Sequence, residues 1–358
     1  MTSQNHKTFV YVGIGGEHPL AAAAEPNSLG EGGLFRRGDD EEAWQPLTDG
    51  LPADPQVRAM AIHPENPQVL FAGTQDGVYR TSDRGEHWEA TDSPKAEVWS
   101  IVFHPTKPDI MLAGFDKGMI CKSEDSGLTW KKTDTGKVVF PHITMEPTEI
   151  VKRIIGLSFD AASPLDVYGA VEVGGLLASR DGGDTWESIT DGHYTRMGPV
   201  DLHGVQVNSS AAGLVYIITQ LAMFRSRDRG QRWEFVPIDE MFPGGSYCRG
   251  LIVAPNDPNI MYLAAGAGGG SAPQGTVEEG ALMRSKDAGE TWDRLDLGDV
   301  PGTRMFQIAI DAAAPSHVYC TDYSGDVYSS YDSGETWSKS QVPVETSRAR
   351  HVYPMVCG

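Results

Sequence analysis

Short apolar runs recur along the whole chain, and glycine, proline or acidic clusters separate them. Runs of one kind end in a proline turn; they lie at residues 57–67, 98–108, 248–258 and 305–315. Runs of a second kind follow such turns; they lie at residues 69–74, 110–115, 166–171, 214–219, 260–265 and 317–322. Apolar runs of this length, bounded by turn residues, are typical of β-strands. The pattern therefore predicts an all-β protein.

A polar octet with the pattern [ST]-x-D-x-G-x-x-W follows these pairs of strands. It occurs six times, ending at Trp88, Trp130, Trp186, Trp233, Trp292 and Trp337. A seventh, altered copy ends at Trp44 and has Glu41 in place of the glycine. Seven copies in 358 residues give about 51 residues per repeat, the length that a four-stranded propeller blade needs. We expect each blade to run strand A, proline turn, strand B, loop, strand C, octet turn and strand D.

The residues of the octet suit a structural role. The aspartate can accept backbone N–H groups within a tight turn, and the glycine can adopt positive φ. The tryptophan can pack flat against the neighbouring blade. A catalytic group would not be needed six times, so we expect these aspartates to stabilise the fold.

The two ends of the chain predict a closed ring. Residues 8–15 read as a B-type strand, whereas residues 349–358 read as an A strand that lacks its blade. If the last strand completes the first blade, no sheet edge stays exposed. We therefore expect residues 1–358 to form a single domain, a seven-bladed β-propeller of four-stranded antiparallel blades.

The octets resemble the Asp-box, or BNR-repeat, signature of the sialidase-like superfamily. This superfamily includes sialidases, xyloglucan-active glycoside hydrolases, sortilin-type receptors and Ycf48-like assembly factors, so the resemblance implies the fold and not one activity. A sialidase would carry an Arg-Ile-Pro arginine in its first blade. The comparable segment here, GLFRRGDD at residues 33–40, lacks it, which argues against cleavage of sialic acid.

Composition excludes several partners. The formal charge is -20, from 29 Lys plus Arg against 49 Asp plus Glu, and such a surface repels nucleic acid and anionic membranes. No apolar run reaches the roughly 18 residues of a membrane span, and the N-terminus lacks the features of a secretory signal. We therefore expect a cytoplasmic protein. Its four widely spaced cysteines fit reduced, buried thiols.

Long insertions indicate which face of the ring carries function. The segments 15–34, 131–152, 188–202, 235–248 and 265–281 all map to the face where the A strands start. Variable loops on a rigid scaffold are where function usually lies. Aligning the A strands gives two rows of side chains that open onto the central channel. One row is Arg58, Trp99, Ile155, His203, Arg249, Phe306 and Val352, and the other is Gln56, Glu97, Arg153, Asp201, Tyr247, Arg304 and Arg350.

Five arginines in these rows predict a site for an anion. Arg58, Arg153, Arg249, Arg304 and Arg350, together with Trp99, are the candidate substrate-binding residues. A guanidinium offers paired donors that match a carboxylate or phosphate. The alternative is that the arginines form inter-blade ion pairs with acids such as Glu97 and Asp201. The register of the last strand leaves Arg350 and His351 interchangeable.

The same rows hold groups that can transfer protons. His203, Tyr247, Glu97 and Asp201 are the candidate catalytic residues, and a satisfied polar rim is the alternative. Several histidines of this face could approach a metal: His18, His142, His193 and His203. No HExxH motif or close histidine pair supports one. We therefore expect that no cofactor is required, with a divalent metal as the open alternative.

These features favour a cytoplasmic hydrolase or lyase that acts on a small acidic substrate, such as a sugar acid. The arginines would hold the carboxylate while His203 or Tyr247 moves the proton, with Glu97 or Asp201 assisting. The alternative is a non-enzymatic scaffold that binds an acidic segment of a partner protein. A deep funnel at the channel mouth would favour the enzyme, and a wide, plugged channel would favour the scaffold.

Overall fold

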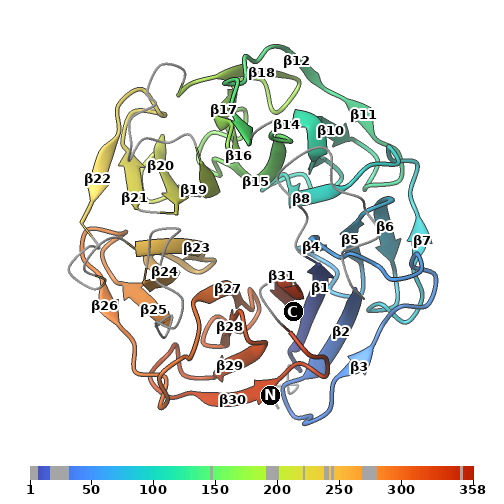
Figure 1. Cartoon of the computed structure of the whole chain (residues 1–358), viewed down its shortest axis with the longest axis vertical. Helices are drawn as coiled ribbons and strands as arrows, with labels where there is room; N and C mark the ends of the chain where they lie inside the picture. Colours follow the sequence, from blue (N-terminus) through green and yellow to red (C-terminus); the bar gives the residue numbers. More distant parts are fainter. Residues whose placement is uncertain are drawn as a thin grey trace.

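The computed structural model describes residues 7–16, 32–145, 148–190, 201–220, 222–237, 242, 246–267, 280–346 and 350–358. Seven sheets are arranged in a ring around a central axis (Figure 1). The described residues contain one turn of 3-10 helix, η2 (Asp116–Gly118), and no α-helix. Within this part of the chain, no helix has the length and apolarity needed to cross a bilayer. The prediction of an all-β propeller is confirmed.

Each blade has four antiparallel strands, and they follow one another from the channel outward. Blade 1 consists of β31 (Arg350–Cys357), β1 (Phe9–Gly16), β2 (Gly33–Gly38) and β3 (Gln45–Pro46). Blade 2 consists of β4 (Ala59–Ile62), β5 (Leu70–Thr74), β6 (Gly77–Thr81) and β7 (Glu89–Ala90). Blade 3 consists of β8 (Val98–Phe103), β9 (Met111–Phe115), β10 (Ile120–Ser123) and β11 (Lys131–Lys132). Blade 4 consists of β15 (Arg153–Phe159), β16 (Val167–Glu172), β17 (Gly175–Ser179) and β18 (Thr185–Ser188).

The remaining blades follow the same order. Blade 5 consists of β19 (Leu202–Asn208), β20 (Leu214–Thr219), β21 (Met223–Ser226) and β22 (Glu234–Val236). Blade 6 consists of β23 (Ser246–Ala254), β24 (Asp257–Ala267), β25 (Gly280–Ser285) and β26 (Asp293–Arg294). Blade 7 consists of β27 (Met305–Ile310), β28 (Val318–Asp322), β29 (Asp326–Ser330) and β30 (Ser338–Gln341). Between blades 3 and 4, β12 (Asp134–Lys137) adds a parallel fifth strand to β18, and β13 (Thr144–Met145) pairs with β14 (Thr148–Glu149).

The C-terminal strand closes the ring. β31 pairs with β1 in antiparallel register, and Phe9 and Gly358 exchange two backbone hydrogen bonds of 3.1 and 3.0 Å. The inner strand β31 also contacts β27 of blade 7 and β4 of blade 2. The first and last described strands, β1 and β31, therefore both belong to blade 1, as the sequence predicts, and Figure 1 shows them side by side.

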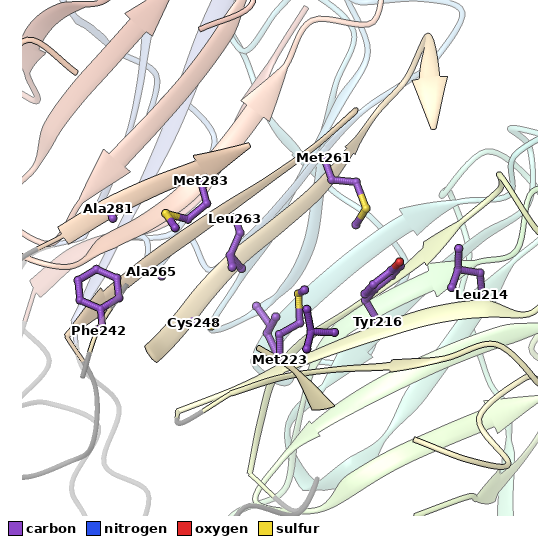
Figure 2. Packing of buried hydrophobic residues seen from close by; sticks show 12 residues of the cluster. Leu214, Tyr216, Met223, Phe242, Cys248, Met261, Leu263, Ala265, Ala281 and Met283 are labelled. Atoms are coloured by element: carbon purple, nitrogen blue, oxygen red, sulfur yellow. The ribbon is translucent and has the colours of Figure 1, made fainter. Parts of the chain in front are cut away.

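The core is divided into seven apolar clusters, each of which lies between two neighbouring blades. Between blades 5 and 6, Tyr216 and Met223 pack against Met261, Leu263 and Met283 (Figure 2). Each cluster includes one octet tryptophan: Trp44, Trp88, Trp130, Trp186, Trp233, Trp292 or Trp337. The expected inter-blade packing of the tryptophans is confirmed. All four cysteines are free, and Cys357 is the one that is only partly buried.

The octet turns are held by hydrogen bonds within each octet. In blade 4, Asp181 accepts the backbone N–H of Thr185 at 2.9 Å and the hydroxyl of Ser179 at 2.7 Å. The hydroxyl of Ser179 in turn accepts the N–H of Gly183 at 2.8 Å. Gly183 has φ of 93°, and the residue before the octet glycine is left-handed as well, for example Arg84 with φ of 63°. These contacts give the octets a structural role.

Candidate active site at the channel mouth

A shift in strand pairing occurs at the same place in most inner strands. One extra residue is inserted in β8 at Trp99, in β15 at Ile155, in β19 at His203 and in β23 at Arg249. β27 has its extra residue between Met305 and Ile308. Such a bulge changes the direction in which a side chain points and is common next to active sites. The bulges therefore lie in the row that the sequence alignment places at the channel.

In blade 1, the register of the inner strand differs by one residue from the register that the sequence alignment predicts. Val352 pairs with Ile14 and is buried in the core, and the extra residue of β31 lies between Val352 and Met355. Tyr353 therefore takes the place expected for Val352, and His351 takes the place expected for Arg350. Arg350 pairs with Gly16 at the start of the strand, and the structure describes its backbone alone. The alignment missed this shift because no proline turn follows the last strand.

Aromatic side chains meet near the central axis of the propeller. The rings of Trp99 and Tyr353 lie 5.8 Å apart, and Tyr353 lies 6.3 Å from Phe306. His351 stacks on Tyr353 at 4.4 Å. Trp99 belongs to blade 3 and Tyr353 to blade 1, which are not neighbours, and the guanidinium of Arg58 from blade 2 contacts both rings. Side chains of blades 7, 1, 2 and 3 thus meet on this side of the channel.

We call this group of residues the channel cluster. Its members are Arg58, Glu97, Trp99, Arg153, Glu172, Asp201, His203, Tyr247, Arg249, Arg304, Phe306, Tyr323, His351 and Tyr353.

Two arginines of the cluster are paired with carboxylates. Arg58 donates from Nε to Glu97 at 2.5 Å and joins blades 2 and 3. Arg153 donates to Glu172 at 2.9 Å across β15 and β16, and it lies 4.7 Å from the Trp99 ring. The pair of Arg58 with Glu97 is an inter-blade ion pair of the kind considered as the alternative to an anion site, whereas the pair of Arg153 with Glu172 lies within blade 4. Both arginines are buried.

Arg249 and Arg304 have a different environment. Arg249 donates to the hydroxyl of Tyr247 at 2.7 Å, and its guanidinium lies 5.4 Å from the ring of Phe306. Arg304 lies 4.1 Å from the Tyr247 ring and donates to the carbonyl of Ala267. Among the described residues, no carboxylate forms an ion pair with Arg249. Arg249 is only partly buried.

Asp201 and Glu172 form a pair of interacting carboxyl groups. Burial, together with the negative charge of Glu172, raises the pKa of Asp201 to about 6, although Arg249 and the N–H of Val173 oppose the change. Val173 has φ of 51°, which is unusual for a β-branched residue, and its carbonyl accepts Lys152 Nζ at 2.8 Å. A strained turn thus presents its N–H to Asp201. Near pH 6, Asp201 can therefore donate a proton.

His203 is held as a neutral imidazole. Its Nδ1 lies 2.8 Å from the carbonyl of Cys248, which can only accept, so Nδ1 donates and Nε2 keeps a free lone pair. Burial lowers the pKa of His203 well below its ordinary value, and the charges of Arg249 and Arg304 contribute in the same direction. The ring centroid of His203 lies 4.8 Å from that of Tyr247.

The structure thus brings together the candidate residues whose side chains it describes. These are Arg58, Glu97, Trp99, Arg153, Asp201, His203, Tyr247, Arg249 and Arg304. Sequence reasoning missed Glu172, Tyr323 and Tyr353. Glu172 lies opposite Arg153 in the sheet, so pairing strands A and B residue by residue could have found it.

The described residues contain no group of three or more side chains suited to a metal, and His18 and His193 lie outside them. A cavity of about 330 Å³ lies in blade 6, where Gly280–Leu282 and Arg294–Leu297 line it together with Asp299, Val300 and Pro301. No residue of the channel cluster lines it.

Comparisons with known proteins agree with the fold. No protein-family model matches the chain. A xyloglucanase of Paenibacillus sp is 25% identical over 328 residues, which cover 79% of this chain and 31% of that protein. A probable oligoxyloglucan-reducing end-specific xyloglucanase of Neosartorya fischeri is 24% identical and covers 76% and 38%. This chain thus spans between about a quarter and two-fifths of the length of the first curated relatives.

Solved structures show the same architecture. The GH74 xyloglucanase from Xanthomonas campestris superposes with a TM-score of 0.61 at 20% identity, over 85% of this chain and 50% of that chain. YCF48 from Cyanidioschyzon merolae superposes with a TM-score of 0.53 at 16% identity, over 83% and 88%. The chain is a seven-bladed β-propeller, and the proteins that it resembles in sequence are mostly named as xyloglucanases.

Proposed function

We propose that this chain is a glycosidase-like hydrolase that acts on a carbohydrate bearing a carboxylate group. The observation that carries the proposal is the carboxyl pair of Asp201 and Glu172 beside aromatic rings, with the pKa of Asp201 raised to about 6 by burial. The xyloglucanases among the similar proteins support the reaction class. Glycosidases characteristically use two carboxyl groups, one as acid and one as base or nucleophile.

The cluster supplies a role for each of these groups. Protonated Asp201 would donate its proton to the oxygen of the leaving sugar. Glu172, which accepts from Arg153, would activate water or stabilise the positive charge that develops on the sugar ring. The rings of Tyr247 and Phe306 offer apolar faces against which a sugar can stack.

Arg249 is the residue that would select an acidic substrate. It is the partly exposed arginine that Tyr247 and Phe306 hold in place without a carboxylate partner among the described residues. A guanidinium recognises a carboxylate through two parallel hydrogen bonds. The same contact would acidify a C–H next to the carboxylate, so elimination from a uronate is the related reaction to be tested alongside hydrolysis.

The test is an activity screen on uronate-containing and neutral oligosaccharides, including xyloglucan. New reducing ends would report hydrolysis, and ultraviolet absorbance of an unsaturated product would report elimination. We expect Asp201→Asn to lower the rate by about 10²- to 10⁴-fold, the usual contribution of a general acid. Asp181→Asn in an octet is the matched control and keeps the activity per folded molecule. Full activity in both Asp201→Asn and Glu172→Gln would refute the assignment.

A binding scaffold is the second candidate function. The rings of Trp99 and Tyr353 meet on one side of the channel at the level of the bulges, and a channel plugged by such side chains would suit a surface that binds a partner. In that case Arg249 would bind an acidic protein segment. A chain that hydrolyses and eliminates no oligosaccharide but binds an acidic peptide, and loses this binding in Arg249→Ala, would favour the scaffold.

A further inference from the structure

One turn of blade 4 contacts both interacting carboxyl groups of the channel cluster. Val173 and Gly174 connect β16 to β17, and the N–H of Gly174 donates to the carbonyl of Val171 at 3.1 Å. Glu172 is the last residue of β16, and the N–H of the next residue, Val173, donates to Asp201. The position of this turn therefore affects how Glu172 and Asp201 lie relative to each other.

The backbone of this turn is strained at Val173. Its φ is 51°, whereas a positive φ at the third residue of a β-turn normally belongs to glycine or asparagine. A β-branched residue keeps such a conformation only where the surrounding structure holds it. Groups that hold Val173 therefore hold the turn.

The corresponding turns of blades 2 and 5 are supported by their own first residue. In blade 2 the hydroxyl of Thr74 donates to the carbonyl of Gly77 at 3.1 Å. In blade 5 the hydroxyl of Thr219 accepts the N–H of Ala222 at 3.0 Å. The first residue of the blade 4 turn is Val171, whose side chain has no polar atom. This turn lacks the internal support that the other two have.

Lys152 supports the blade 4 turn from outside. The residue is 6% exposed, and its Nζ donates to the carbonyl of Val173 at 2.8 Å. Its own carbonyl accepts the N–H of Gly118, in η2 of blade 3, at 2.8 Å. Burial lowers the pKa of Lys152, and the charge of Glu149 opposes this change. Burying an ammonium group costs free energy that an apolar side chain would not cost, so the lysine is explained by the bond that it makes and not by packing.

We propose that Lys152 is a positioning residue, whose hydrogen bond holds the Val173 turn so that the turn holds Asp201 beside Glu172. Val173 is fixed on both sides, because its N–H donates to Asp201 and its carbonyl accepts from Lys152. Glu172 is held independently, since Arg153 lies opposite it in the sheet and donates to it at 2.9 Å. This role rests on the proposed function, in which Asp201 donates the proton.

Lys152→Met should release the turn and change the pH dependence of the reaction. The Val173 N–H favours ionised Asp201, so its loss leaves burial and Glu172 opposed by Arg249 alone and raises the pKa of Asp201 further. The pH above which kcat/KM falls should rise by about one pH unit, the effect of one backbone hydrogen bond on a carboxyl group. Misplacement of the acid should lower kcat by about 10- to 100-fold, with little change in KM.

Two other variants separate this role from a general loss of structure. Lys95→Met is the matched control, because Lys95 donates to the carbonyl of Asp76 at 3.4 Å in the corresponding turn of blade 2 but is exposed; its pH profile should equal that of wild type. Val173→Asn should restore the wild-type profile in the Lys152→Met background, because asparagine adopts positive φ more readily than valine.

The double variant keeps the test decisive. If Lys152→Met does not fold, Lys152→Met with Val173→Asn is compared directly with wild type, and a wild-type profile supports the role. A wild-type profile in Lys152→Met alone would overturn it. A double variant that does not fold, or whose profile is not restored, would also overturn it, because Lys152 would then act by a route other than the turn.

Calorimetry distinguishes failure of this role from failure of the proposed function, because it needs no substrate. The Tm that Asp201→Asn gains at pH 8 relative to pH 4 reports the raised pKa of Asp201. This gain should be larger by about 2 °C in the Lys152→Met background than in wild type. If the wild-type chain cleaves no oligosaccharide but the gain is larger, the proposed reaction is wrong and Lys152 still positions Asp201. Equal gains in both backgrounds would overturn the positioning role whether or not the chain is active.

Discussion

Replacing Asp201 by asparagine should stabilise the protein at high pH and not at low pH. Burial raises the pKa of this carboxyl from its ordinary 3.8 to about 6. A carboxyl group whose pKa is raised by folding contributes stability that is fully present below pH 3.8 and is lost as the pH rises through about 6. Asparagine keeps an oxygen to accept the N–H of Val173 and cannot ionise, so the variant avoids this loss.

The magnitude follows from the two pKa values. The difference between 3.8 and about 6 corresponds to about 3 kcal/mol at pH 8. For a chain of 358 residues, an unfolding entropy of about 2.1 cal/mol/K per residue converts this free energy into a rise in Tm of about 4 °C. At pH 4 the expected difference between wild type and Asp201→Asn is near zero.

Differential scanning calorimetry at pH 4 and pH 8 measures both quantities. Asp181→Asn provides a control of opposite sign. Burial opposes ionisation of Asp181, but hydrogen bonds from Thr185 and Ser179 outweigh it and lower its pKa, so the variant should lose stability at pH 8. Equal Tm differences for Asp201→Asn at both pH values would refute the assignment of a raised pKa to this carboxyl. They would also remove the reason for naming Asp201 as the acid.

Three further predictions concern the octets and the mouth. Asp181→Ala should lower the free energy of unfolding by about 1 to 3 kcal/mol, because backbone donors lose their acceptor; denaturant titration measures this, and loss of activity in the folded variant would contradict a structural role. Arg249→Ala should weaken binding of a carboxylate ligand by about 2 to 5 kcal/mol, with poor rescue by lysine; unchanged affinity in calorimetry would argue against the anion contact. Hydrogen bonds from Thr336 lower the pKa of Asp332 to about 2. The ionised Asp332 carboxylate therefore stabilises the fold above pH 3.8, and this stabilisation is lost as the pH falls through about 2. Acid unfolding of Asp332→Asn should lack this loss of stability, and an acid transition like that of wild type would contradict the prediction.

The fold could be predicted because the residues of each octet are determined by tertiary packing between blades. A tryptophan at a fixed place in each repeat requires an equivalent inter-blade position, and seven such positions define seven blades. The left-handed residue before the octet glycine could not be predicted in the same way. Residues as different as Arg84 and Ala288 occupy it, so their types carry no signal for this conformation.

The candidate site could be predicted only in part. The inner strands share a two-residue spacing, which is why Glu97, Arg153 and Asp201 were found together. The partner of each arginine was not predictable, because ion pairs such as Arg153 with Glu172 depend on pairing between strands. The raised pKa of Asp201 depends on burial, which no residue type specifies. In the last strand, one inserted residue shifts the register, so that His351 occupies the position at which the sequence alignment predicts Arg350.

The residue types are constant on the octet face of the propeller and vary at the bulges of the channel face. On the octet face, the same residue types recur because each turn needs the same hydrogen bonds and the same packing. At the channel, the inner strands of blades 3, 4, 5 and 6 insert Trp99, Ile155, His203 and Arg249. One backbone feature thus presents four chemically different side chains. Backbone geometry does not select these residue types, which is why a repeat pattern could predict the octet face and could not predict the side chains at the channel.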